Sequence, residues 1–186
     1  IDDTLVDDII KNETDVTKNN INEFIKNRTI TSYNDHTGIL EGKNIIVIIM
    51  ESVVEIIINK DLYPNFYKLY SEGISFKNNY SPRNSCATGN NEFSGMTSLY
   101  TIQNNCTANI YSNNKYFTSI FNLFKNAGYK TSSMHDYTEQ YYVRHIIHKN
   151  LGSDAYYNVN DLNIPYYNEY KNWASDEDFM NAAMDI

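Results

Sequence analysis

The strongest signal in the hydrophobic pattern is an unbroken apolar run over residues 45–50, shortly after Gly42. A run without alternation is typical of a strand that is buried on both faces, as in a parallel sheet flanked by helices. Ligands of such sheets gather at the carboxyl ends of the strands. Glu51 follows the run directly, so its carboxylate belongs either to a site or to the start of an ordinary loop.

Beyond this run the pattern alternates between helical and extended segments. Helices are predicted over residues 64–72, 88–99, 115–127 and 138–150, and from Asp176 onward after a Ser175 cap. Further strands are predicted over residues 74–80 and 129–134, and residues 151–170 resemble a loop. The order of strands and helices predicts an α/β fold with a mostly parallel sheet flanked by helices.

Two of the predicted helices carry patterned side chains. In the segment 115–127, Phe117, Ile120, Phe121 and Phe124 recur at helical spacing, and we expect this stripe to lie in the core. In the segment 138–150, His145 and His148 are three residues apart. This spacing is compatible with a metal site, but it fits surface histidines better.

Residues 1–42 differ from the rest of the chain because they are polar and acidic, with only loosely recurring apolar positions. The pattern is sufficient for two short amphipathic helices, for which Asp2 or Asp3 and Thr17 are plausible caps. We interpret this segment as an arm that leads into a domain covering residues 43–186.

Thr88 stands at the start of the predicted helix 88–99 and has two interpretations. It is either a simple helix cap or a hydroxyl presented at a helix N-terminus, where backbone N–H groups and the helix dipole favour an anionic phosphate. A second polar pair, His135 and Asp136, follows the predicted strand 129–134.

The two cysteines, Cys86 and Cys106, do not have the spacing of a zinc site. They are free thiols in a reducing compartment. In an extracellular location they could form a disulfide, which would stabilise the fold by roughly 3 kcal/mol.

Composition and charge narrow the class of protein. The chain has 186 residues, enough for a domain with a core, and a formal net charge of −8. It shows no basic patch, so nucleic acid is not an expected partner. Its longest apolar run is too short to span a membrane. The chain begins at Ile1 without a signal-peptide pattern, which we interpret as a trimmed chain or a fragment.

Several separated motifs, taken together and in order, resemble one known family. They are TGILEGKNIIVIIMES, YPNFYKLYSEGISFKNNYS, ATGNNEFSGMTSLY and AGYKTSSMHDYTEQYYVR, which start near residue 37. This set resembles the extracellular catalytic domain of lipoteichoic acid synthases, in the sulfatase branch of the alkaline phosphatase superfamily. The resemblance implies an α/β domain of that type, here incomplete, outside the cell membrane of a Gram-positive-type bacterium and anchored by preceding membrane helices.

The resemblance also implies an activity. In this family a threonine attacks the phosphate of phosphatidylglycerol, and the phosphoglycerol group then passes to a teichoic acid or glycolipid acceptor. By position, Thr88 matches the nucleophile and Glu51 matches a ligand of the Mn²⁺ or Mg²⁺ ion, to which Thr88 also binds. His135, Arg144 and Tyr142 match the substrate-phosphate pocket. An oxygen ligand suits these ions, and the planar arginine fork suits phosphate.

Three departures from the family pattern bear on these expectations. The family commonly has a tryptophan two residues before the arginine, where this chain has Tyr142, so the transferred head group stays open. The downstream Asp-His metal ligands are absent after His135, so we expect this chain alone to be inactive. Around Cys86 the Pro and Arg of the sulfatase formylglycine pattern are missing, which argues against a true sulfatase. A phosphoethanolamine transferase, another phosphodiesterase and a non-catalytic envelope-binding domain remain alternatives.

Overall fold

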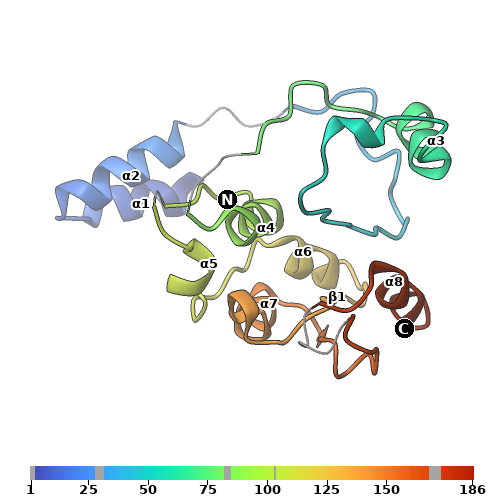
Figure 1. The fold of residues 1–186 in the computed structure, drawn as a ribbon. Coiled ribbons are helices and arrows are strands. Elements are labelled where there is room, and N and C mark those ends of the chain that lie inside the picture. Colours follow the sequence, from blue (N-terminus) through green and yellow to red (C-terminus); the bar gives the residue numbers. More distant parts are fainter. Residues whose placement is uncertain (1–2, 28–31, 82–84, 103, 168–172) are drawn as a thin grey trace. The chain divides into compact units, whose positions relative to one another are not determined.

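The computed structural model describes residues 3–27, 32–81, 85–102, 104–167 and 173–186. The chain divides into two compact units, residues 1–47 and 48–186. Figure 1 shows the elements in chain order. In the first unit, α1 (Asp3–Asn12) packs against α2 (Val16–Lys26). The two helices predicted for the acidic arm are therefore present, but the cap of α2 is Asp15, whose side chain accepts from the backbone N–H of Thr17.

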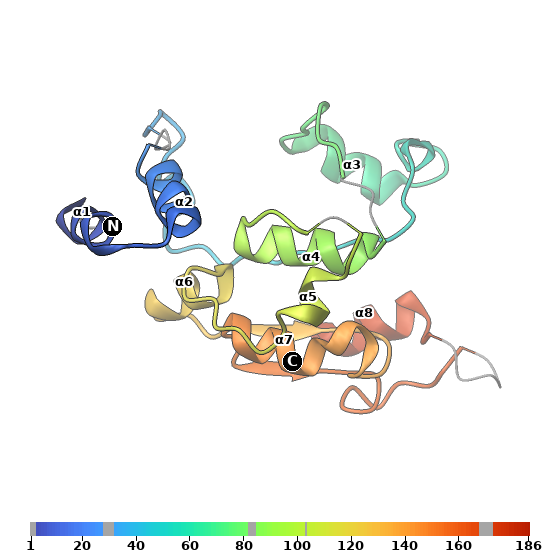
Figure 2. The same ribbon diagram turned by 90° about the vertical axis from the view of Figure 1, so that its left-hand side faces the viewer.

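The regular secondary structure described in the second unit is mostly helical. Its elements are η1 (Glu55–Ile57), α3 (Pro64–Glu72), α4 (Ala87–Thr97), α5 (Thr107–Ile110), α6 (Ile120–Asn126), β1 (Ser132–Met134), η2 (Tyr141–Val143), α7 (Arg144–Leu151), β2 (Ala155–Tyr157) and α8 (Asp176–Met184). The helix α4 packs against α5 and α6, and α7 packs against α6 and β2. Figure 2 shows α4, α5 and α7 from the side.

A parallel pair of strands supports the predicted fold class. β1 pairs with β2 in parallel, with Ser133 opposite Tyr156. Helix α4 contacts α6, α6 contacts α7, and α7 contacts β2. The hydrophobic core of the second unit is formed by Phe93, Ala108, Phe121, Ile147 and Leu151. These residues come from α4, α5, α6 and α7, so the core joins the helices that carry the candidate site.

Two predicted strands are wrong in this structure. Residues 45–50 have no regular secondary structure, and their side chains are between 47% and 78% exposed. Residues 74–80 are likewise not a strand. A strand needs hydrogen-bonding partners from a neighbouring backbone. Within the described ranges no segment pairs with either stretch, so these β-forming sequences do not become strands here.

The helix boundaries agree with the local sequence signals better than the strands do. The predicted helix 64–72 matches α3, which has Pro64 in its first turn. Ser175 caps α8 as expected, because its hydroxyl accepts from the N–H of Asp178. The helix predicted from residue 115 begins only at Ile120, because the Ser119 side chain caps α6 there. Phe121 is buried as predicted, whereas Phe117 is exposed, so only part of the aromatic stripe reaches the core.

The segment 138–150 was predicted as one helix and is broken. Tyr142 and Val143 adopt left-handed φ angles of 55° and 47°, and α7 starts directly after them at Arg144. The segment 151–170 was predicted as loop and contains β2. None of the helices among the described residues is long and apolar enough to cross a membrane.

Candidate functional site

Thr88 lies in the first turn of α4 and is not the cap of that helix. The cap position is Cys86, and it makes no side-chain capping bond. The Thr88 hydroxyl, Oγ1, instead donates a hydrogen bond of 2.7 Å to Oε1 of Glu51, 37 residues earlier in the chain. The structure therefore brings together the two residues that the sequence analysis selected as nucleophile and metal ligand.

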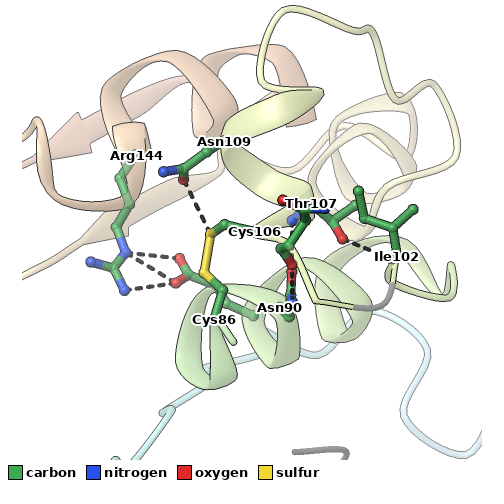
Figure 3. The surroundings of a disulfide bond; sticks show 9 residues. Cys86, Asn90, Ile102, Cys106, Thr107, Asn109 and Arg144 are labelled. Carbon is green, nitrogen blue, oxygen red and sulfur yellow. Dashed lines mark hydrogen bonds and ion pairs between the residues drawn. A yellow bond between two sulfur atoms is a disulfide. The ribbon is translucent and has the colours of Figure 1, made fainter. Parts of the chain in front are cut away.

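Local sequence alone gives α4 little stability. Its sequence, ATGNNEFSGMT, has two glycines, two asparagines and two threonines, which are all weak helix formers. The helix is held by contacts to the segment before α5. Cys86 and Cys106 form a disulfide (Figure 3). The fully buried Asn90 donates to the carbonyl of Asn105 at 2.8 Å and accepts from the N–H of Thr107 at 2.8 Å.

Arg144 does not lie open to solvent, as a simple substrate ligand would. Its side chain is buried, and its Nε and Nη2 atoms donate to the carboxylate of Glu92 at 2.8–3.2 Å. Nε2 of His148 lies 2.5 Å from the same carboxylate. The prediction that His148 is a surface residue is therefore wrong, because this ring is 3% exposed.

The electrostatics of this group favour an ionised Glu92. Burial alone would raise the pKa of Glu92, but the hydrogen bond from His148 and the charges of His148 and Arg144 outweigh it and lower the pKa to about 2. The carboxylate is thus a permanent anion at neutral pH. We refer to Glu92, Arg144 and His148 as the buried triad.

His135 follows β1 directly, as predicted. Burial, helped by the positive charge of Arg144, lowers the pKa of His135 to about 4, so the ring is neutral at pH 7. Its Nδ1 accepts a hydrogen bond from the N–H of Tyr137 at 3.1 Å, which places the ring proton on Nε2. His135 therefore presents a neutral N–H donor. The 3.5 Å contact with Asp136 is not an ion pair at this pH.

Aromatic rings gather beside these groups. The Arg144 guanidinium lies 5.1 Å from the ring centroid of Tyr142 and 5.4 Å from that of Tyr141. Trp173, far along the sequence, packs against Tyr141 at 4.9 Å and His135 at 5.4 Å. An indole thus reaches this region although the position two residues before Arg144 is a tyrosine.

Glu51 belongs to the same surroundings. Burial, together with the nearby carboxylates of Asp176 and Glu51, raises the pKa of Asp136, the residue that follows His135. Glu51, which accepts the hydrogen bond from Thr88, is thus one of the charges that act on the residue after His135.

The side chains of Glu51 and Thr88 suit the expected divalent ion in part. The carboxylate of Glu51 and the hydroxyl of Thr88 are adjacent hard oxygen atoms, which suit Mg²⁺ or Mn²⁺. In the part of the chain that the structure describes, no group of three or more His, Cys, Asp or Glu side chains is arranged to hold a metal ion. The two oxygens fit such an ion in type and form only part of a coordination sphere.

Sequence reasoning missed Glu92, His148 and Trp173. Two of them had a usable signal, since Glu92 is four residues after Thr88 and His148 is four residues after Arg144. Residues at this spacing lie on one face of a helix. Trp173 had no such spacing signal, because it is 38 residues from His135 in the sequence.

Comparisons with known proteins bear on the family and on the fold. Residues 43–186 match the family model described as Sulfatase. Two curated lipoteichoic acid synthases, from Staphylococcus aureus strains USA300 and NCTC 8325, are each 27% identical over 168 residues, which is 83% of this chain and 26% of the relative. The chain thus spans about a quarter of the length of the curated relatives that it matches.

One solved structure is also similar. The crystal structure of the lipoteichoic acid synthase LtaP from Listeria monocytogenes superposes with a TM-score of 0.50 at 22% identity, covering 56% of this chain and 25% of that chain. This likeness confirms the predicted sulfatase-like α/β fold.

Proposed function

The chain belongs to the sulfatase family, and from this premise we propose that it is part of a metal-dependent phosphoglycerol transferase. The donor is the head group of phosphatidylglycerol, and the acceptor is a teichoic acid or glycolipid of the cell envelope. The observation that carries the proposal is the 2.7 Å hydrogen bond from Thr88 Oγ1 to Glu51. The names of the similar relatives, lipoteichoic acid synthases, point to the same chemistry.

Thr88 is the nucleophile in this proposal. A threonine hydroxyl is a weak nucleophile near neutral pH unless its proton has an acceptor or the oxygen binds a metal. Oε1 of Glu51 already accepts that proton in a hydrogen bond. The Thr88 oxygen bonds to phosphorus as the bond between phosphorus and the diacylglycerol oxygen breaks. The proton that Thr88 gives to Glu51 passes to that oxygen, so that diacylglycerol leaves as a neutral alcohol. The phosphoglycerol group stays on Thr88 until the acceptor takes it.

A bound Mn²⁺ or Mg²⁺, held in part by Glu51 and Thr88, would lower the pKa of the hydroxyl and offset charge on the phosphoryl oxygens. His135 donates from Nε2 to a phosphoryl oxygen, because its ring is neutral and its proton sits on that atom. Arg144 supplies positive charge, and Tyr142 packs beside the guanidinium.

The place of the reaction follows from the substrate. A lipid head group and an envelope polymer meet at the outer face of the cell membrane, so we expect the domain from residue 43 onward to lie there. The arm of residues 1–42 would then connect it to membrane helices.

The head group is the open part of this proposal, because Tyr142 stands where the resembled family commonly has tryptophan. The test is to give the full-length natural protein phosphatidylglycerol or phosphatidylethanolamine with Mn²⁺. Release of diacylglycerol from the first alone supports the proposal. Release only from the second makes it a phosphoethanolamine transferase. No release from either makes it a binding domain.

A further inference from the structure

The carboxylate of Glu92 links the candidate nucleophile to the candidate phosphate ligand. Glu92 lies one helical turn after Thr88 on α4, so both side chains project from the same face of one helix. Its two oxygens hold Nε and Nη2 of Arg144 at 2.8–3.2 Å. A displacement of Arg144 relative to Thr88 would have to break this paired contact.

The contact leaves one arginine nitrogen unused. Nη1 of Arg144 is buried and finds no hydrogen-bond partner among the described residues. Buried polar atoms are satisfied in the great majority of cases, so an unsatisfied one calls for an explanation. A cavity of about 10 Å³, lined by Gly89, Glu92, Tyr142 and Arg144 among others, adjoins the group and has room for about one water molecule.

The backbone before Arg144 is strained in a way that fits a fixed position. Tyr142 and Val143 both adopt left-handed φ angles, and for the β-branched Val143 this conformation is a genuine outlier. Such residues are unfavourable and persist where the surroundings hold them. The contacts of the buried triad, directly after these residues, supply that restraint.

We propose that Glu92 is a positioning residue for the proposed transfer. By holding Nε and Nη2, it keeps the positive charge of Arg144 in register with Thr88, near the place where the substrate phosphate would bind. His148 completes the arrangement, because it binds the other side of the same carboxylate at 2.5 Å and limits its movement. This inference rests on the proposed function for the identity of its ligand, a phosphate ester.

The test measures ligand binding separately from turnover. The full-length natural protein is titrated calorimetrically with sn-glycerol 1-phosphate in the presence of Mn²⁺. The variants are Glu92→Gln, Glu92→Asp, Arg144→Gln and the double variant Glu92→Gln/Arg144→Gln. Glu177→Gln, which removes the same charge from an exposed position on α8, is the matched control. Circular dichroism establishes that each titrated protein is folded.

The expected results follow from losing a charge-assisted contact. We expect the Kd to rise about tenfold or more in Glu92→Gln and to stay unchanged in Glu177→Gln. In the Arg144→Gln background the Glu92 change should add nothing, because Glu92 acts through Arg144. A residue that merely stabilises the fold would not change the Kd of folded protein. An unchanged Kd in folded Glu92→Gln, or an equal loss in both backgrounds, overturns the inference.

If Glu92→Gln fails to fold, the Glu92→Asp variant tests the positioning role in its place. It keeps the charge but withdraws the carboxylate by one methylene, so we expect a Kd at least about threefold higher, and an unchanged Kd overturns the inference. Wild type that binds no glycerol phosphate also overturns it. If the wild type binds glycerol phosphate but releases no diacylglycerol, the proposed function is overturned. The Kd values of the Glu92 variants then still test whether Glu92 positions Arg144.

Discussion

At the residue scale, the site depends on close contacts that particular side chains allow. Gly89 follows Thr88, and a Cβ atom added to it would lie 2.9 Å from Cys86 Sγ and 3.2 Å from two ring atoms of Tyr142. Only glycine lets the first turn of α4 approach the disulfide and Tyr142 this closely. Thr88 and Glu51 were candidate site residues in the sequence, but the close approach of Gly89 to Tyr142 was not predicted, because these two residues are more than fifty positions apart.

Gly89→Ala is therefore expected to destabilise the chain. Overpacking costs about 1–3 kcal/mol, against about 1 kcal/mol gained in helix propensity. The control is Gly95→Ala on the same helix, where a Cβ meets nothing within 4 Å and a gain of about 0.5–1 kcal/mol is expected. Urea unfolding of both variants measures the difference. Equal changes in the two would contradict the close packing at Gly89.

The ionised state of Glu92 predicts an acid-sensitive stability. Its carboxyl has a pKa of about 2 in the folded chain and about 4.5 as its ordinary value. Because the folded-state pKa is lower, the stabilisation is complete above about pH 4.5 and is lost as the pH falls toward 2. Protonation of Glu92 should therefore lower the free energy of unfolding by on the order of 3 kcal/mol.

The free energy of unfolding, measured against pH in wild type and in Glu92→Gln, isolates this contribution from that of other carboxylates. The wild-type curve should fall more steeply between pH 4.5 and 2 than the Gln curve. Parallel curves would show that Glu92 has an ordinary pKa.

At the element scale, helices with clear local signals were predictable and weakly coded ones were not. The helix α3 has its proline start and α8 has its serine cap, and both were placed correctly. The helix α4 has weak intrinsic propensity, and its position relies on the disulfide and on Asn90. The segment 138–150 is not one helix, because Tyr142 and Val143 adopt left-handed φ angles and α7 starts only at Arg144. Such interruptions depend on tertiary contacts, which the local sequence does not show.

Reduction of the disulfide is expected to loosen α4. Cys86 and Cys106 are 20 residues apart, and closing a loop of that length stabilises a fold by about 3 kcal/mol. Urea unfolding with and without reductant should show this loss in wild type. The Cys86→Ala/Cys106→Ala variant should be insensitive to reductant. A reductant-independent wild type would contradict a structural disulfide.

At the scale of the whole molecule, the sheet was the least predictable part. The residues 45–50 have the composition of a central strand, but a parallel strand is stable only between neighbours. The described residues form only the pair β1 and β2. A sequence pattern shows that a segment can be a strand, whereas pairing depends on other segments. The α/β class was nevertheless recognisable, since it depends on the order of elements.

The few protein ligands of the candidate metal site predict that the 186-residue chain alone is inactive. Glu51 and Thr88 give two oxygen ligands, whereas Mg²⁺ prefers six and Mn²⁺ is similar. We expect the chain of residues 1–186 to release no diacylglycerol from phosphatidylglycerol under conditions in which the full-length protein does. Turnover by the isolated chain would show that these residues suffice.

The most direct test of the central claim is Mn²⁺-dependent release of diacylglycerol from phosphatidylglycerol by the full-length natural protein and its Thr88 variants. Thr88→Ala, which lacks the attacking oxygen, should lose at least about a thousandfold in rate. Thr88→Ser keeps the hydroxyl and should retain part of the activity. Wild-type rates in Thr88→Ala would contradict the account, because the hydrogen bond between Thr88 and Glu51 would then have no part in the reaction.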